Sequence, residues 1–200
     1  MEKAITYLLK KEAVFEQINQ QYGIPIQPKR AQGFETLVLL ILEQQVSIDS
    51  AKATFNKLKN AIPIFSIQNV YRFSDEDFRS CGVSRQNTKY IKALSEAILS
   101  EQINIESLAC KMPELVREEL IKIKGIGNWT IDIYLMFCLN SLDIIPLGDI
   151  AVVNTMKELF DTHSKEEMEI YAQKWKPYRS VATYLLWHYY LEKRGRKISF

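Results

Sequence analysis

Apolar residues recur with a helical period along most of this 200-residue chain. The clearest stripe has apolar positions spaced i, i+3, i+4, i+7 and i+8, which predicts one buried helix face: Phe34, Leu37, Val38, Ile41 and Leu42. Strand-like alternation is scarce, and the best extended candidate, residues 143–147, contains a proline. The pattern therefore predicts an all-α protein of about ten short helices.

Serine residues precede several of these periodic stretches and predict where helices begin. A serine hydroxyl at the N-cap accepts a hydrogen bond from an otherwise unpaired backbone N–H of the first turn. Ser47, Ser74 and Ser84 fit this role, and Ser164 with Glu167 three positions later forms the pattern of a capping box. Asp149 is a further cap candidate, for a helix over residues 150–160.

The stretch KIKGIGNWTIDIY, residues 122–134, joins two helical patterns through a glycine-containing turn. The first pattern ends near Ile123 and the second begins near Asn128. Gly125 and Gly127 allow the backbone a positive φ and leave no side chain in the way of an approaching group. The bare GxG pattern is also compatible with a sharp corner between two helices and nothing more.

The start of the second helix has the features of an anion site. The first N–H groups of a helix lack partners within it, and the helix dipole favours negative charge there. A DNA phosphate fits this description. The candidate phosphate-binding residues are Lys124, Gly125, Gly127, Trp129 and Thr130.

Composition narrows the class of protein. The chain is 47% hydrophobic and 25% charged, which is ordinary for a globular domain, and no apolar run reaches the ~18 residues of a membrane span. The amphipathic N-terminus is unlike a signal peptide. Cys81, Cys110 and Cys138 have no CxxC spacing, so we expect a reducing compartment, no disulfide framework and no zinc or Fe–S site. We therefore expect a cytoplasmic protein, nucleoid-associated if the source is prokaryotic.

Positive charge is concentrated near the C-terminal end. The net charge of the chain is only +2, but residues 174–197 contain one acid, Glu192, and seven bases: Lys174, Lys176, Arg179, Lys193, Arg194, Arg196 and Lys197. Such a stretch favours a polyanionic partner. It is equally compatible with a solvated face that only improves solubility.

Four motifs together resemble a known family. LIKIKGIGNWT, residues 120–130, resembles the helix-hairpin-helix of DNA-repair glycosylases. Residues 40–55 are similar to the family's I-L-x-Q-Q-ϕ-S segment, and residues 146–154 to the segment with its catalytic aspartate. WKPYRSVATYLLW, residues 175–187, resembles the alkylated-base branch typified by 3-methyladenine DNA glycosylase II. Twenty positions separate Trp129 from Asp149, as in that branch.

Departures from the family pattern define the subclass. Bifunctional relatives have a lysine nucleophile where this chain has Trp129, so the resemblance implies no Schiff-base strand cleavage. No cysteine follows Cys138, so the Fe–S cluster of the endonuclease III branch is not expected. The chain also resembles a minimal form, without the N-terminal β-rich domain of the bacterial 3-methyladenine enzyme.

The resemblance also assigns roles to individual residues. It makes Gln45 the plug that enters the space left by an extruded nucleotide. Trp129, Trp187 and the nearby Tyr178 become the candidate pocket for the extruded base. A surface glutamine at a helix end is the alternative for Gln45, and many aromatic residues at helical spacing belong only to the core.

Asp149 is the candidate catalytic residue by the same resemblance. Cleavage of an N-glycosidic bond develops oxocarbenium character on the sugar, and a nearby carboxylate stabilises that charge or orients the attacking water. A cationic alkylated base is a good leaving group, so no cofactor and no strong general acid is expected. The backbone carbonyls of Ile121, Ile123 and Ile126 are candidate ligands of a structural monovalent cation.

The expected protein is therefore a two-lobed, all-α DNA glycosylase fold. Residues 36–142 would form a central helical barrel, with the helix-hairpin-helix at about 113–139, and residues 1–35 with 143–200 the second lobe. We expect a monomeric, monofunctional enzyme that releases alkylated purines from damaged double-stranded DNA, with no membrane partner. The alternatives are a glycosylase for uracil, hypoxanthine or an oxidised purine, and a non-catalytic helix-hairpin-helix module that holds DNA for a partner.

Overall fold

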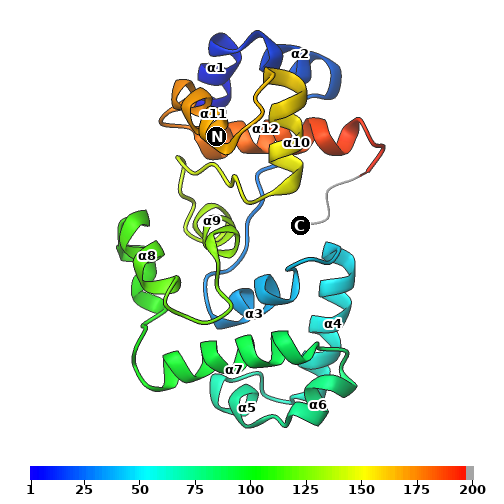
Figure 1. Ribbon diagram of the computed structural model, residues 1–200, viewed down its shortest axis with the longest axis vertical. Coiled ribbons are helices and arrows are strands. Elements are labelled where there is room, and N and C mark those ends of the chain that lie inside the picture. The colour runs from blue at the N-terminus through cyan, green and yellow to red at the C-terminus, as the bar shows by residue number, and fades with distance from the viewer. Residues whose placement is uncertain (197–200) are drawn as a thin grey trace. The chain divides into compact units, whose positions relative to one another are not determined.

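The computed structural model describes residues 1–196, and every regular element in that range is helical (Figure 1). The all-α prediction is therefore confirmed, although the described residues form twelve α-helices and two 3₁₀ helices where about ten were expected. The chain divides into two compact units. We call Arg30–Tyr134 the hairpin unit, and Met1–Lys29 together with the chain from Leu135 onward the terminal unit. The lobe bounds expected from the sequence, 36–142 and 1–35 with 143–200, stay a prediction.

The hairpin unit contains most of the middle helices. They are α3 (Phe34–Leu42), α4 (Ile48–Ala61), α5 (Ile67–Arg72), α6 (Asp75–Ser80), α7 (Arg85–Leu99), the 3₁₀ helix η1 (Glu106–Cys110), α8 (Pro113–Leu120) and most of α9 (Asn128–Phe137). Helix α3 packs against α4 and α7, and α5 packs against α7. The predicted stripe of α3 is buried, but Leu40 between its positions is buried too. Helix α3 is thus enclosed over more of its circumference than an amphipathic pattern implies.

The terminal unit is built from both ends of the chain. Its helices are α1 (Glu2–Lys11), α2 (Ala13–Tyr22), α10 (Ile150–Phe160), α11 (Lys165–Ala172), the 3₁₀ helix η2 (Gln173–Trp175) and α12 (Arg179–Glu192). Helix α12 packs against α1, α2 and α10 (Figure 1). An aromatic cluster of Phe15, Phe160, Tyr171 and Trp175 lies between these helices. Burial, followed by the charge of Glu12, raises the pKa of Tyr171 to about 12.

The predicted helix caps are confirmed. Ser47, Ser74 and Ser84 each accept a hydrogen bond from the backbone N–H three residues later, at 3.1–3.3 Å. Ser164 and Glu167 form the complete capping box. Because these bonds involve neighbouring residues only, a short sequence pattern is enough to place the helix starts. Within residues 1–196, no helix is both long enough and apolar enough to cross a membrane.

Candidate functional site

The turn between α8 and α9 needs glycine at one position for two reasons. Gly125 has a φ of 93°, which side chains rarely adopt. A Cβ on Gly125 would also lie 2.0 Å from Cγ of Tyr90 on α7. The expectation that Gly127 shares this conformation is wrong, since its φ lies outside the left-handed region. Gly127 instead leaves open space, because nothing lies within 4 Å of the position of its Cβ.

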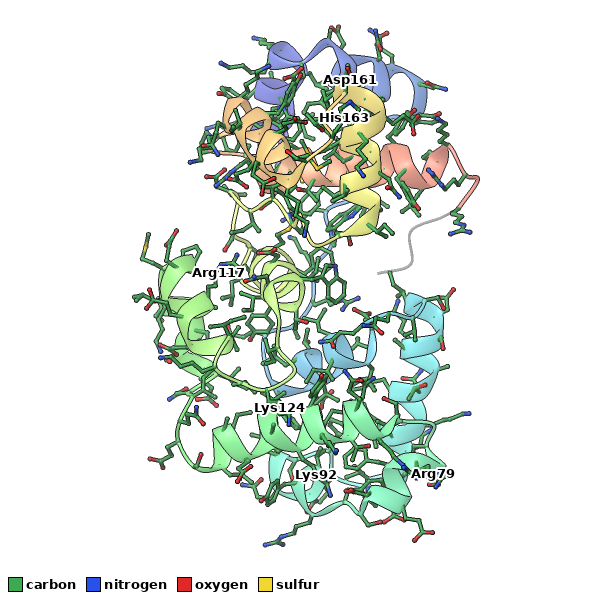
Figure 2. All side chains as sticks on the ribbon, viewed as in Figure 1. Arg79, Lys92, Arg117, Lys124, Asp161 and His163 are labelled. Carbon is green, nitrogen blue, oxygen red and sulfur yellow. The ribbon has the colours of Figure 1, made fainter. Side chains whose placement is uncertain are left out.

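Gly127 therefore stands exposed directly before the first turn of α9. Its carbonyl accepts the first helical hydrogen bond, from the N–H of Ile131 at 3.1 Å. Lys122 and Lys124 are exposed beside the turn, and Figure 2 labels Lys124. Bare backbone, a helix N-terminus and lysines in one place give the arrangement that binds a phosphate group.

Thr130 differs from the other predicted phosphate ligands. Its side chain is buried, and its hydroxyl accepts a hydrogen bond from Nε2 of Gln44 at 3.1 Å. The hydroxyl is thus turned toward the protein, which leaves the backbone N–H as the group suited to the predicted role. The carbonyl of Ile123 accepts a hydrogen bond from the N–H of Ile126 at 3.0 Å, within a local turn. The monovalent-cation site at Ile121, Ile123 and Ile126 stays a prediction.

A polar bridge joins the two helices of the hairpin. Arg117 on α8 donates to Oδ1 of Asn128 at 3.0 Å and also pairs with Asp132 on α9 (Figure 2). The Asp132 side chain is only 8% exposed, so the guanidinium group compensates a largely buried carboxylate. The bridge fixes the start of α9 against α8. Sequence analysis did not single out Arg117, because its partners lie 11 and 15 positions away.

The predicted plug lies in a short loop that connects α3 to α4, residues 43–47. Gln45 is exposed and has a φ of 64°. The left-handed conformation costs an ordinary residue ~1–2 kcal/mol, so the surrounding contacts must maintain it. At the first position of the 43–47 loop, Glu43 forms a bidentate pair with Arg30 at 2.7 and 2.8 Å. Both side chains of that pair are less than 10% exposed, and loss of one partner from such a pair costs ~3–5 kcal/mol.

Gln44 links the 43–47 loop to the glycine turn. Its Nε2 donates to the carbonyl of Gly125 at 2.8 Å, in addition to the bond with Thr130. Gln44 lies within the motif of residues 40–55, which by itself indicates no role for it. The only signal was the adjacent Gln44–Gln45 pair, since the bonds join residues more than 80 positions apart.

In the terminal unit, Asp149 caps α10 as expected. Its Oδ1 accepts from the N–H groups of Ala151 at 3.0 Å and Val152 at 3.1 Å. The same oxygen accepts from the indole Nε1 of Trp187 at 3.1 Å. Three N–H donors thus converge on one oxygen of a half-buried carboxylate and fix its orientation.

Trp187 is held by an aromatic cluster of its own unit. Its ring meets Phe137 edge-on, with the centroids 5.8 Å apart, and stacks on Tyr184 at 6.1 Å. Tyr184 belongs to the core, and burial raises its pKa. Trp187 is 8% exposed, so only a small part of its surface reaches solvent.

The segment before Asp149 is fastened to the start of α12. The N–H of Ser180 donates to the carbonyl of Leu142 at 2.9 Å, and the N–H of Ile144 donates to the Ser180 hydroxyl at 3.0 Å. Arg179 pairs with Asp143 at 2.8 Å beside them. Helix α12 therefore holds the Asp149 segment at its N-terminal end as well as through Trp187.

Tyr178 is not brought to Trp187. It is the N-cap residue of α12, nine positions before Trp187, which is ~13 Å along a helix axis. Its ring packs edge-on against Tyr7, with the centroids 5.3 Å apart, and Tyr7 donates to the carbonyl of Lys176. Trp129, the other predicted pocket residue, is the half-buried second residue of α9 in the hairpin unit.

The basic C-terminal stretch carries less unpaired charge than its composition indicates. Arg179 pairs with Asp143 and Glu169 and is 14% exposed. Lys193 pairs with Glu158, and this bond together with one from Tyr189 lowers the pKa of Glu158. The acids lie outside the counted stretch, so a local charge count missed them. Lys197 lies outside the described residues.

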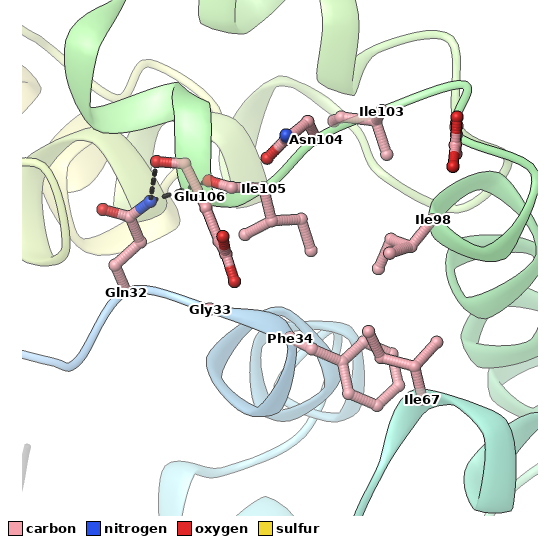
Figure 3. A pocket seen from close by; sticks show the side chains of 10 residues that line it. Gln32, Gly33, Phe34, Ile67, Ile98, Ile103, Asn104, Ile105 and Glu106 are labelled. Atoms are coloured by element: carbon pink, nitrogen blue, oxygen red, sulfur yellow. Dashed lines mark hydrogen bonds between the residues drawn. The ribbon is translucent and has the colours of Figure 1, made fainter.

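The hairpin unit also contains a hollow. It has a volume of about 880 Å³ and is lined by α3, α5, α7 and the segment before η1 (Figure 3). Gln32 on its wall donates Nε2 to the carbonyls of Ile105 at 2.7 Å and Glu106 at 3.3 Å. None of the residues that line this hollow is a predicted site residue.

Comparison with known proteins shows the family of this chain. The chain matches the model of the HhH-GPD superfamily base excision DNA repair proteins over residues 38–180. That range includes the hairpin, the 43–47 loop and Asp149, and the chain belongs to this superfamily.

Individual relatives are named for alkylated bases. The chain is 33% identical over 164 residues to an alkylbase DNA glycosidase-like protein of Schizosaccharomyces pombe, covering 77% of this chain and 76% of the relative. It is 29% identical to DNA-3-methyladenine glycosylase 1 of the same organism, covering 80% and 73%.

Solved structures are similar as well. The crystal structure of a DNA-3-methyladenine glycosidase from Bacillus halodurans matches with a TM-score of 0.82 and 28% identity, over 96% of this chain and 91% of that one. The S. pombe 3-methyladenine DNA glycosylase in complex with abasic DNA matches with a TM-score of 0.80 and 26% identity, over 92% and 95%.

Proposed function

We propose that this chain is a monofunctional, monomeric DNA glycosylase that removes alkylated purines from double-stranded DNA. The products are the free base, of the 3-methyladenine or 7-methylguanine type, and an abasic site. Membership of the HhH-GPD superfamily and the names of its relatives support the class of reaction. The observation that carries the chemistry is the fixed Asp149–Trp187 pair at 3.1 Å.

DNA is held first through its backbone. A phosphate docks against the first turn of α9, where Gly127 presents no side chain and the helix dipole favours an anion. Lys122 and Lys124 add positive charge, which makes binding dependent on salt. These contacts are independent of sequence, as a search for rare damaged bases requires.

The damaged nucleotide is then rotated out of the duplex, and Gln45 fills the space that it leaves. The indole ring of Trp187, whose N–H holds Asp149, contacts the extruded base. Stacking on an aromatic ring contributes ~1–3 kcal/mol for any base. The positive charge of an alkylated purine adds a cation–π interaction of ~0.5–2 kcal/mol, which favours it over an undamaged base.

Asp149 supports cleavage of the N-glycosidic bond. The electron pair of that bond leaves with the cationic base, which departs neutral, while positive charge develops on the sugar. The Asp149 carboxylate stabilises this charge and orients the water that adds to C1′, and the proton of that water passes to the carboxylate or to solvent. The three N–H donors on Oδ1 hold the group in place, so little reorganisation accompanies the reaction.

The test is chromatography of the bases released from duplexes that each contain one lesion. We expect release of 3-methyladenine and 7-methylguanine, with strand breaks only after alkali. Release of uracil, hypoxanthine or 8-oxoguanine in their place would assign a different lesion class. If the protein binds every duplex tightly and releases no free base, it is a non-catalytic DNA-binding module.

A further inference from the structure

The 43–47 loop contains two adjacent glutamines in opposite situations. Gln45 is exposed in a left-handed backbone conformation, whereas Gln44 is half-buried and directed into the protein. Glu43 and Arg30 fix the entry to the loop, and the Ser47 cap fixes its exit. Between those two points, the printed bonds of Gln44 attach the loop to the hairpin turn.

Gln44 makes these attachments with one group of atoms. Its amide nitrogen has two hydrogens, and it donates to the Gly125 carbonyl at 2.8 Å and to the Thr130 hydroxyl at 3.1 Å. Gly125 belongs to the turn and Thr130 to the first turn of α9. The side chain of Gln44 therefore contacts both parts of the proposed phosphate-binding site, the glycine turn and the first turn of α9.

We propose that Gln44 is a positioning residue that fixes Gln45 relative to the phosphate-binding turn. The inference rests on the proposed function, because it assigns Gln45 to base extrusion. A phosphate docked at the turn fixes the position of the DNA along the protein. Gln44 then fixes the position of Gln45 relative to that phosphate. Gln44 acts through Gln45 and touches neither the base nor the sugar.

Physical reasoning favours this role over simple stabilisation. Insertion of a plug needs a defined position, since a displaced group meets stacked bases in place of the vacated space. Without the hydrogen bonds of Gln44, the loop that holds Gln45 in its left-handed conformation is less restrained. Part of the free energy of DNA binding is then used to order the loop. Phosphate docking itself uses backbone groups of α9, which Gln44 does not supply.

The test compares Gln44→Met with Gln32→Met as the matched control. Methionine keeps the length of the side chain and removes both donors. Gln32 is a half-buried glutamine of the same unit whose amide also donates to two oxygens, the backbone carbonyls of Ile105 and Glu106, away from the loop (Figure 3). Extrusion is measured by the fluorescence of 2-aminopurine placed beside a lesion, which rises when stacking is lost. This readout needs no bond cleavage.

We expect Gln44→Met to reduce the fluorescence rise and to slow single-turnover excision of a paired lesion about tenfold. Affinity for the duplex should change less than twofold, and a mispaired lesion should recover most of the rate. The double variant Gln44→Met/Gln45→Ala should be no slower than Gln45→Ala, because both changes remove one function. Gln32→Met should leave extrusion unchanged.

Additive losses in the double variant, or equal losses on paired and mispaired lesions, would overturn the proposal. So would loss of extrusion in Gln32→Met to the same degree. If the wild-type chain releases no base at all, the proposed function fails, while the fluorescence comparison still tests the role of Gln44.

Discussion

The indole N–H of Trp187 donates to Oδ1 of Asp149 across 38 positions of sequence, at 3.1 Å. One aromatic residue thus holds the carboxylate and belongs to the proposed base pocket. The oxygen is shared with the first turn of α10, so the cap and the tryptophan constrain the same atom. The proposed catalytic role of Asp149 is compatible with its role as a helix cap, and substitutions can separate the two.

Asp149→Asn should abolish most base excision and preserve the fold. Asparagine caps a helix about as well as aspartate, so stability should change little. Loss of a charge that stabilises the transition state typically lowers the rate by a factor on the order of 10²–10³. The rate of base release under single-turnover conditions measures the loss. Hypoxanthine, if it is a substrate, is the better lesion because 7-methylguanine is also released spontaneously. A lower melting temperature with near wild-type excision would leave Asp149 as a cap only.

Trp187→Phe should slow excision with less effect on lesion binding. Phenylalanine keeps an aromatic face and removes the donor to Asp149. A hydrogen bond to a charged group contributes ~1.5–3 kcal/mol, so we expect a loss of about tenfold or more in rate. Tyr184→Phe is the control, because it alters the neighbouring ring without touching the carboxylate. Equal effects of the two variants would show that only packing matters.

Gly127→Asp should remove DNA binding while the protein stays folded. A side chain at Gly127 meets nothing within 4 Å, and an acid at a helix start favours the helix. The same charge repels a phosphate from the first turn of α9. Fluorescence anisotropy with a lesion duplex at low salt gives the affinity. If this variant binds DNA with wild-type affinity, the turn is only a corner between two helices and does not bind a phosphate.

Gly125→Ala should act in the opposite way and destabilise the fold. The new Cβ would overlap Tyr90, and its backbone conformation is one that alanine rarely adopts. Overpacking of this kind costs ~1–3 kcal/mol, which corresponds to a fall of roughly 2–12 °C in melting temperature for a domain of this size. Tyr90→Ala in the same chain should restore part of the loss. An unchanged melting temperature in Gly125→Ala would contradict the packing described here.

Borohydride should trap no covalent complex between this chain and lesion DNA. Reduction captures a Schiff base only where a protein amine has attacked the sugar, and the sequence resemblance places Trp129 where bifunctional relatives have a lysine. Gel electrophoresis of the reduced mixture checks this, with a bifunctional glycosylase as positive control. A shifted band from the pure chain would mean that another amine is the nucleophile.

Features that depend on neighbouring residues were predictable from sequence. The serine caps, the capping box and the Asp149 cap all involve atoms within four positions. The glycine turn was located as well, but only Gly125 needs its conformation, because φ depends on the fold around it. More of the surface of α3 is buried than the apolar stripe predicts. The period of a helix indicates one buried face, and it does not reveal that other helices also cover the remaining sides.

Contacts between distant residues were beyond the pattern. Gln44 and Gln45 are adjacent residues of the same type, so the sequence does not distinguish them. Only the fold directs Gln44 into the protein and leaves Gln45 exposed. Tyr178 was placed with Trp187 by proximity in sequence, yet along a helix nine residues separate groups by more than two turns. The pairing of Arg179 with Asp143 likewise joins segments 36 positions apart.

The double attachment of the Asp149 segment to α12 also predicts how it behaves in time. Leu142 and Ile144 are hydrogen-bonded to Ser180, and Asp149 is hydrogen-bonded to Trp187, so local opening of the segment must break contacts both in the first turn and in the middle of α12. The backbone amides of Ile144 and Ser180 should then exchange with deuterium together with those of α12, as one cooperative unit. The carboxylate would keep its position until the whole helix detaches, so catalytic competence would end in a single step rather than decay gradually with rising temperature.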